Sequence, residues 1–314
     1  MSRIVFLIPA FAKFKPMKFK VGVLLCLISF ACESQIDQSL KYLKQVPPSV
    51  VPKVFAPGVI SKEGEYEFGS VFNQTADEFF YGVVNSGKSE IRYSRLKGKE
   101  WTEPETIVVH ESYGYNDPFL SPDENRLYFI SDRALDGVGS KINHDIWYVE
   151  KSENGWSDPI NAGTNINSAD KEYYMSFTKD GTMYFSSNVN APEERKGYDF
   201  DIYYSKNIDG VFQEAVKLGD SINTLWYEAD VFIDPDETYI IFSAGRKEGF
   251  GRGDLYISFR NADGTWSKSK NMEQPINSEK HELCPFVSLD GKYLFYTSNQ
   301  DIYWVDAKII DQYR

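Results

Sequence analysis

Short apolar segments alternate with polar turns from about residue 60 to residue 310. In each unit a half-apolar segment, such as residues 118–121, leads through an Asp-containing turn to an almost wholly apolar segment, such as residues 127–130. Asp-Gly and Asp-Glu turns between two such segments are typical of β-hairpins. We therefore expect a pair of antiparallel strands in each unit, with the apolar second strand covered on both faces.

Two further strands are expected in each unit. The third begins with an acidic residue and then alternates, as in residues 145–148, and the fourth carries a large aromatic side chain. The acidic starts are Glu90, Asp145, Asp201, Asp254 and Asp301, and the aromatic residues are Trp101, Trp156, Phe212 and Trp266. We interpret these acidic residues as caps of turns or strand ends. Four strands per unit with no helical pattern between them predict the blade of a β-propeller.

The unit repeats with an almost constant period, because the turn residues Asp123, Asp180, Asp236 and Asp290 are 57, 56 and 54 residues apart. A period of this size indicates a repeat array. Five first strands are present, but the fifth unit ends without an aromatic fourth strand. Residues 52–61 resemble residues 159–168, which follow a tryptophan, so residues of about 51–60 are expected to complete the last blade. We therefore expect an all-β fold, a five-bladed β-propeller of four-stranded antiparallel blades, closed by an N-terminal strand that completes the last blade.

Three parts of the unit resemble a known repeat. They are the turn at residues 121–124, the strand end at residues 128–133 and the third strand at residues 145–148. Together they resemble the TolB-type, WD-like propeller repeat over about residues 60–310. The resemblance implies a propeller fold. It does not select a function, because such domains serve in scaffolding, in periplasmic assembly and in enzymes.

The N-terminal residues have the pattern of an export signal. Lys18 and Lys20 precede an apolar run at residues 21–31, which is too short to span a bilayer and is followed by Cys32. This resembles a bacterial lipobox, which implies lipidation of Cys32. The alternative is a plain secretory signal with an incidental cysteine.

We therefore expect three segments: a lipoprotein signal peptide at residues 1–31, a flexible tether at residues 32–50 and the propeller domain at residues 51–314. The expected location is the outer membrane, on its periplasmic or cell-surface side, with the lipid as the only membrane contact. Cys26 would leave with the signal and Cys32 would carry lipid, so Cys284 would be the only cysteine of the folded domain.

The charge excludes one class of partner. The whole chain has a net charge of −12, and its first 31 residues contain five basic and no acidic residues, which leaves −17 on the remainder. Nucleic-acid binding needs a basic surface, so no nucleic-acid partner is expected. We expect a monomer that binds an envelope protein or a polysaccharide.

Function on a rigid scaffold often lies in variable loops, here residues 133–144, 188–201 and 244–253. In three units a glutamate lies four residues before the central position of the first strand: Glu172, Glu228 and Glu282. Asp117 lies near the corresponding place in unit two. These carboxylates would converge on the mouth of the central channel. They could bind a cation or a sugar, or act as paired acids and bases. The alternative, which we favour, is a repeated hydrogen bond at each blade junction.

Other candidates occur once. Arg133 and Arg246 could clamp a carboxylate or sulfate, or form ion pairs with neighbouring acids, which we favour. His144 and His281 could act as a general base or metal ligand. No zinc-binding spacing is present, so no zinc site is expected. Trp226 and its aromatic neighbours could stack on sugar rings, although packing between blades is the simpler interpretation.

Two functions remain. The first is a lipid-anchored binding or scaffolding module that presents its loop face to a protein or glycan. The second is a carbohydrate-active enzyme, a glycosidase or polysaccharide lyase, with its site at the central channel mouth, because five-bladed propellers resemble arabinanase-type glycosidases. No cofactor is expected, apart from a possible cation bound in the channel. Signatures of phosphate and dinucleotide binding are absent from the sequence.

Overall fold

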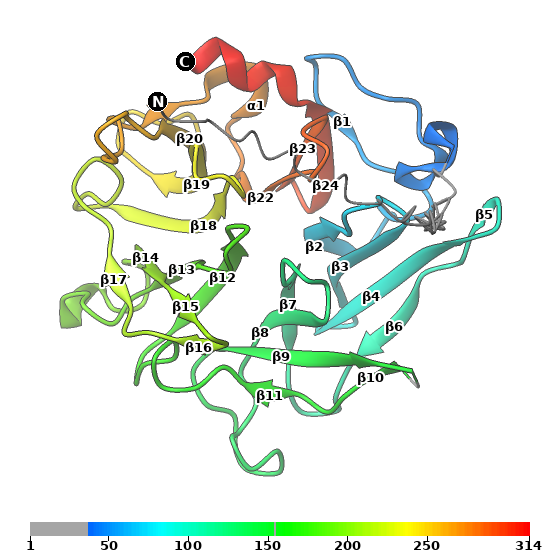
Figure 1. Cartoon of the computed structure of the whole chain (residues 1–314), viewed down its shortest axis with the longest axis horizontal. Helices are drawn as coiled ribbons and strands as arrows, with labels where there is room; N and C mark the ends of the chain where they lie inside the picture. The colour runs from blue at the N-terminus through cyan, green and yellow to red at the C-terminus, as the bar shows by residue number, and fades with distance from the viewer. Residues whose placement is uncertain (1–36, 154) are drawn as a thin grey trace, which may run out of the picture. The chain divides into compact units, whose positions relative to one another are not determined.

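The computed structural model describes residues 37–153 and 155–314, and within them five antiparallel sheets surround a central axis (Figure 1). The sheets follow one another around the axis in chain order, as the blades of a propeller do. The expected all-β, five-bladed fold is confirmed. The predicted signal peptide and Cys32 lie outside the described residues.

Each blade begins with its innermost strand. Blade 1 contains β2 (Tyr66–Phe72), β3 (Glu78–Asn85), β4 (Lys88–Lys97), β5 (Glu100–Trp101) and β6 (Glu105–Val108); blade 2 contains β7 (Tyr115–Leu120), β8 (Arg126–Ser131), β9 (Asp145–Ser152), β10 (Gly155–Trp156) and β11 (Ile160–Asn161). Blade 3 contains β12 (Glu172–Phe177), β13 (Met183–Ser187), β14 (Asp201–Ser205) and β17 (Val216–Lys217), beside the small hairpin of β15 (Asn207–Ile208) and β16 (Val211–Phe212). Blade 4 contains β18 (Tyr227–Ile233), β19 (Tyr239–Gly245), β20 (Asp254–Phe259) and β21 (Lys270–Asn271).

Blade 5 is built from both ends of the described chain. It contains β22 (Leu283–Val287), β23 (Tyr293–Ser298) and β24 (Asp301–Asp306), and its outer strand is β1 (Lys53–Val54). Val54 lies opposite Tyr303, and the Phe55 N–H donates to the carbonyl of Ile302 at 2.7 Å. The predicted closure by residues 51–60 is therefore confirmed.

The innermost strand of every blade is irregular at the same place. The pairing register shifts within β2, β7, β12, β18 and β22. Each shift falls at or beside a residue with positive φ: Gly69, Asp117, Tyr174, Asp230 and Cys284. A β-bulge bends a strand and re-aims a side chain. These five bulges bring one residue of each blade to equivalent positions on the innermost strands.

The packed domain begins before the expected boundary. The single turns η1 (Gln38–Leu40) and η2 (Tyr42–Lys44) precede β1, and Tyr42 and Leu43 are buried. The indole N–H of Trp101 donates to the carbonyl of Leu40 at 2.7 Å. The expectation of a flexible tether up to residue 50 is corrected here, because an aromatic side chain from this polar segment finds an apolar site on the propeller.

Few helices are present among the described residues. Besides η1 and η2, they are η3 (Glu193–Arg195) in the loop of blade 3, α1 (Glu273–Ile276) before blade 5 and η4 (Ala307–Tyr313) after β24. No helix of residues 37–153 and 155–314 is long and apolar enough to cross a membrane.

Candidate functional site

The recurring glutamates are buried at the blade junctions. Glu172, Glu228 and Glu282 have no exposed surface. Each carboxylate accepts a hydrogen bond at 2.6 Å from the Ser or Thr four residues earlier. Each glutamate N–H also donates to a carbonyl just before the third strand of the preceding blade. These contacts support the favoured structural interpretation, although the carboxylates bind mainly hydroxyl groups rather than backbone.

A longer motif surrounds each glutamate. The sequence Asn-Ser/Thr-x-x-x-Glu begins at Asn167, Asn223 and Asn277. Each Asn side chain bonds both the N–H and the C=O of one residue in the third strand of the preceding blade, for example Ile146 for Asn167. We did not single out these asparagines from the sequence, although their constant spacing from the glutamates was visible there. The motif holds neighbouring blades together and leaves the glutamates closed to ligands.

The two arginines also have internal partners. Arg246 is buried and donates to Glu228 at 3.0 Å, so it forms the ion pair that we favoured. Burial raises the pKa of Glu228, and the hydrogen bonds from Thr224 and the charge of Arg246 oppose that rise. The guanidinium of Arg133 donates to the Tyr115 hydroxyl at 3.3 Å and lies 5.6 Å from the centre of the Tyr113 ring.

The two histidines lie beside tyrosines at the loop end of the propeller. His144 Nδ1 is 3.0 Å from the hydroxyl of Tyr173, and the His281 ring lies 6.5 Å from that of Tyr227. Burial lowers the pKa of His144 and lowers that of His281 to about 4, with the charge of Arg252 adding to the effect on His281. Both imidazoles are therefore neutral near pH 7.

Asp117 is the predicted site residue that the fold brings to the axis. The thiol of Cys284, in blade 5, donates to Oδ1 of Asp117, in blade 2, at 3.3 Å. Asp230 is the equivalent residue of blade 4 and accepts from the Tyr227 hydroxyl at 3.3 Å. A methyl group on Gly69, the blade 1 residue, would lie 2.6 Å from Asp117 Oδ1. The first strands are thus close enough here that blade 1 needs a glycine.

The two axial aspartates titrate unusually. Burial raises the pKa of Asp117 to about 7, and burial together with the charge of Asp117 raises that of Asp230 to about 7. Burial and these two carboxylates also raise the pKa of the Cys284 thiol. Sequence reasoning included Asp117 but missed Asp230 and Cys284, because their common bulge appears only in the strand pairing. Among the described residues, no three His, Cys, Asp or Glu side chains form a group that could hold a metal ion.

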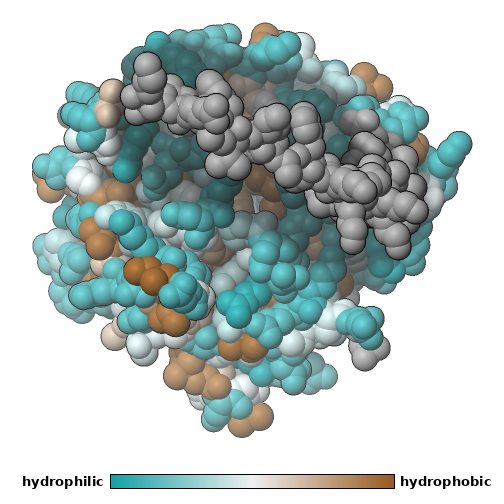
Figure 2. Space-filling view, viewed as in Figure 1, coloured by the Kyte–Doolittle hydropathy of each residue, from teal (hydrophilic) through white to brown (hydrophobic). Residues whose placement is uncertain are grey.

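Exposed apolar side chains are numerous in the loops at the same end. The loops between second and third strands and the connections between blades carry Val109, Leu135, Val138, Tyr198, Leu225, Trp226 and Phe250. Leu225 is 78% exposed and Trp226 is 49% exposed. Arg195 donates to the Leu225 carbonyl at 2.7 Å, so the loop that contains Tyr198 contacts this connection. The surface in Figure 2 is mostly hydrophilic, with apolar residues in small separate groups.

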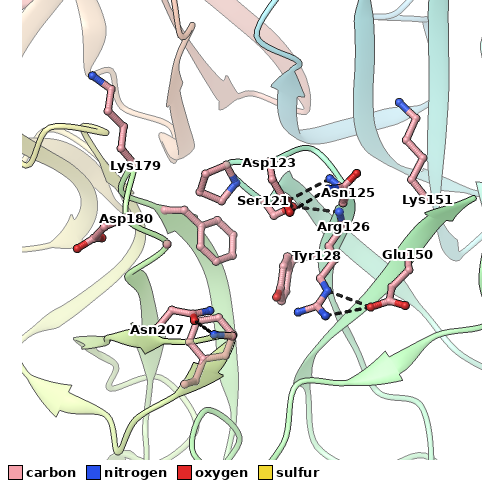
Figure 3. A pocket seen from close by; sticks show the side chains of 15 residues that line it. Ser121, Asp123, Asn125, Arg126, Tyr128, Glu150, Lys151, Lys179, Asp180 and Asn207 are labelled. Carbon is pink, nitrogen blue, oxygen red and sulfur yellow. Dashed lines mark hydrogen bonds and ion pairs between the residues drawn. The ribbon is translucent and has the colours of Figure 1, made fainter.

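A groove between blades 2 and 3 lies at the opposite end, which carries the hairpin turns. Its volume is about 590 Å³, within the range of ligand sites. Tyr128, Phe177 and Phe212 provide aromatic surface, and charged side chains surround them. Figure 3 shows Tyr128 beside Asp123 and the Arg126–Glu150 pair, with Lys179, Asp180 and Asn207 on the other wall. No pattern in the sequence marks this groove, because every unit contains similar aromatic residues.

No protein-family model matches the chain, and no curated protein does either. Among solved structures, a putative TolB from Agrobacterium tumefaciens is 16% identical with a TM-score of 0.48, and the match covers 74% of this chain and 70% of that one. TolB from Acinetobacter baumannii is 14% identical with a TM-score of 0.49, and the match covers 76% of this chain and 53% of that one.

A gluconolactonase from Xanthomonas campestris is 11% identical with a TM-score of 0.45, over 83% of this chain and 96% of that one. Two TolB proteins are thus among the similar structures. At these values the matches carry no argument about function. The assignment of the fold rests on the strand pairing of this chain.

Proposed function

We propose that the protein is a binding module of the bacterial cell envelope that takes a protein partner on the loop end of its propeller. The observation that carries the proposal is the set of exposed apolar and aromatic side chains in those loops, among them Tyr198, Leu225 and Trp226. Exposed aromatic residues on a rigid scaffold are typical anchors of protein interfaces. The blade-junction network beneath them supplies that rigidity.

The envelope location is part of the same proposal. It is supported by the charged and apolar pattern of residues 18–31 and by Cys32, which would carry the lipid. The anchored chain would approach its partner as a monomer. A protein partner is favoured over a polysaccharide because the exposed loop residues include aliphatic side chains, such as Leu135 and Val138, that offer no hydrogen bonds to sugar hydroxyls.

The enzymatic alternative has no specific support. Its three glutamates are occupied by hydrogen bonds inside the blade junctions and have no exposed surface. A general acid or nucleophile must lie within hydrogen-bond reach of the substrate. Turnover of any member of a polysaccharide panel by the wild-type protein would contradict the binding-module proposal.

The proposal predicts a site-specific contact in cells. A photo-crosslinking amino acid at Trp226 should capture one discrete protein, because this side chain would lie within the interface. The same amino acid at Ile160, which is exposed on the outer strand β11 of blade 2, should not capture it. Immunoblots of irradiated cells check the result.

Leu225→Ser should then abolish capture from Tyr198 without changing the melting temperature, because Leu225 is exposed. Equal capture from Trp226 and Ile160, or capture that is unaffected by Leu225→Ser, would reject the assigned surface.

A further inference from the structure

The five blade junctions at the hairpin end differ in what fills them. Between blades 4 and 5, the C-terminal segment lines the junction, and Lys270 Nζ donates to the Tyr313 carbonyl at 2.6 Å. Between blades 1 and 2, an ion pair at 2.9 Å joins Lys151 to Glu78. Between blades 3 and 4, the Tyr184 hydroxyl donates to Glu237. Cavities remain between blades 3 and 4, with a volume of about 420 Å³, and between blade 4 and the C-terminal segment, with a volume of about 630 Å³. The groove between blades 2 and 3, of about 590 Å³, is open as well.

The junction between blades 5 and 1 is filled by Tyr42 of the N-terminal segment. Its ring centre lies 5.0 Å from that of Phe72 and 4.9 Å from that of Tyr293, with both rings edge-on. Its hydroxyl donates to Asp290 Oδ1 at 2.7 Å. The side chain is almost completely buried as a result. A single tyrosine thus combines apolar contact with a charge-assisted hydrogen bond.

The open groove repeats these contacts position by position. Phe177 ends β12 as Phe72 ends β2, and Tyr128 pairs with Tyr148 as Phe295 pairs with Trp304. Asp123 accepts from Ser121 Oγ at 2.6 Å, and Asp290 accepts from Ser288 Oγ at 2.9 Å, so the two turns are alike. Phe212 corresponds to Trp101 in the sequence repeat, and its ring centre lies 6.5 Å from that of Tyr128 across the junction.

One difference lies in the wall. Arg126 replaces Tyr293, and its guanidinium lies 4.6 Å from the centre of the Tyr148 ring. It also pairs with Glu150 at 3.0 Å. A guanidinium attracts the face of an aromatic ring. The substitution therefore keeps the groove suited to an aromatic side chain.

The N-terminal segment binds in the junction between blades 5 and 1 with an energetically unfavourable backbone conformation. Tyr42, Leu43 and Lys44 all have positive φ, between 51° and 57°. Each non-glycine residue in that region costs about 1 kcal/mol or more. The contacts of the segment with blades 5 and 1 must offset this cost. A segment that binds in an extended conformation would not incur this conformational cost.

We propose that the groove between blades 2 and 3 binds a tyrosine side chain from a segment of a partner protein, with the tyrosine hydroxyl donating to Asp123 and the ring packed against Tyr128, Phe177 and Phe212. Three acidic and three basic side chains line the groove, so their charges balance. The aromatic contact and the hydrogen bond to Asp123 therefore determine which side chain the groove prefers. This site is at the end opposite the loops assigned above, so its test is independent of theirs.

The chain itself supplies the probe. A peptide with the sequence of residues 37–46, acetylated and amidated at its ends, is titrated into the purified protein and followed by fluorescence anisotropy. We expect saturable binding that is weakened about tenfold or more by Asp123→Asn, because a hydrogen bond to a charged acceptor is lost. Phe212→Ala should weaken it similarly. A peptide with alanine at the place of Tyr42 should not bind.

The matched control is Asp290→Asn in the junction that Tyr42 already fills. It should leave the affinity for the peptide unchanged. Absence of binding at millimolar peptide would overturn the proposal, as would an affinity that depends on Asp290 and not on Asp123, because the peptide would then have exchanged with residues 37–46. A dimer in sedimentation experiments that Asp123→Asn dissociates would assign the groove to a second copy and also overturn it.

Discussion

Phe55→Ala is expected to lower the free energy of unfolding by about 3–5 kcal/mol, the usual range for loss of a buried phenylalanine. Phe55 is fully buried just after β1, and its ring contacts those of Phe79, Phe295 and Trp304 at centre distances of 5.2–5.3 Å. These partners come from blade 1 and blade 5. The side chain therefore locks the closing strand into the ring, and urea denaturation measures the loss.

Two variants control for this result. Phe55→Leu keeps most of the apolar volume and should lose less, which keeps the comparison informative if the alanine variant does not fold. Val51→Ala lies just before the same strand but is exposed, so its effect should stay within about 0.5 kcal/mol. A loss below about 1 kcal/mol for Phe55→Ala would mean that the segment contributes little to closure.

The second large effect is a dependence of stability on pH that arises at the axis. Asp117 and Asp230 have pKa values of about 7 in the folded protein, against about 3.9 in an unfolded chain. Between these values the folded state holds protons that the unfolded state has released. Stability from this pair is therefore complete below about pH 4 and is lost as the pH rises through 7.

The experiment compares urea denaturation at pH 5 and pH 8. The pair should make the free energy of unfolding of the wild-type protein larger at pH 5 than at pH 8, by on the order of 2–5 kcal/mol. The Asp117→Asn/Asp230→Asn variant should lack this difference. His281 acts in the opposite direction, because its pKa is lowered to about 4, but it is present in both proteins. The exposed Asp209→Asn serves as the control. Identical pH profiles for wild type and double variant would contradict the raised pKa values.

The sequence was sufficient for the architecture because the propeller repeats its physical requirements. Apolar second strands, hairpin turns and outer aromatics recur in every unit, and the missing fourth strand of the last unit pointed to residues 51–60. The segment before them was harder to interpret. Its polar composition suggested a tether, and only the apolar junction that receives Tyr42 explains why it packs.

The candidate sites were less predictable because a residue that recurs in every unit serves the repeat rather than a ligand. A carboxylate repeated in the sequence, as at Glu172, fulfils a requirement of the repeat, and this side chain is fully buried at a blade junction. Asp117 and Asp230 come together through bulges that have no sequence signature. The groove between blades 2 and 3 differs from the junction that Tyr42 fills, and which junction receives the N-terminal segment is a property of the closed ring rather than of any unit.

Closure is tested most directly by a disulfide across the seam between β1 and β24. Val54 and Tyr303 are opposite one another at a pair without mutual hydrogen bonds, since the neighbouring pair carries the bond from Phe55 to Ile302. Such pairs have Cα atoms about 4.5 Å apart, within disulfide range. The control joins cysteines at Lys53 and Tyr303, which point to opposite faces of the sheet.

On mild oxidation, Val54→Cys/Tyr303→Cys should yield one linked peptide in the mass spectrum and a higher urea midpoint, while the control pair stays reduced. Reduced thiols at positions 54 and 303 of the first protein, or equal crosslinking in both, would contradict a ring closed by the N-terminal strand.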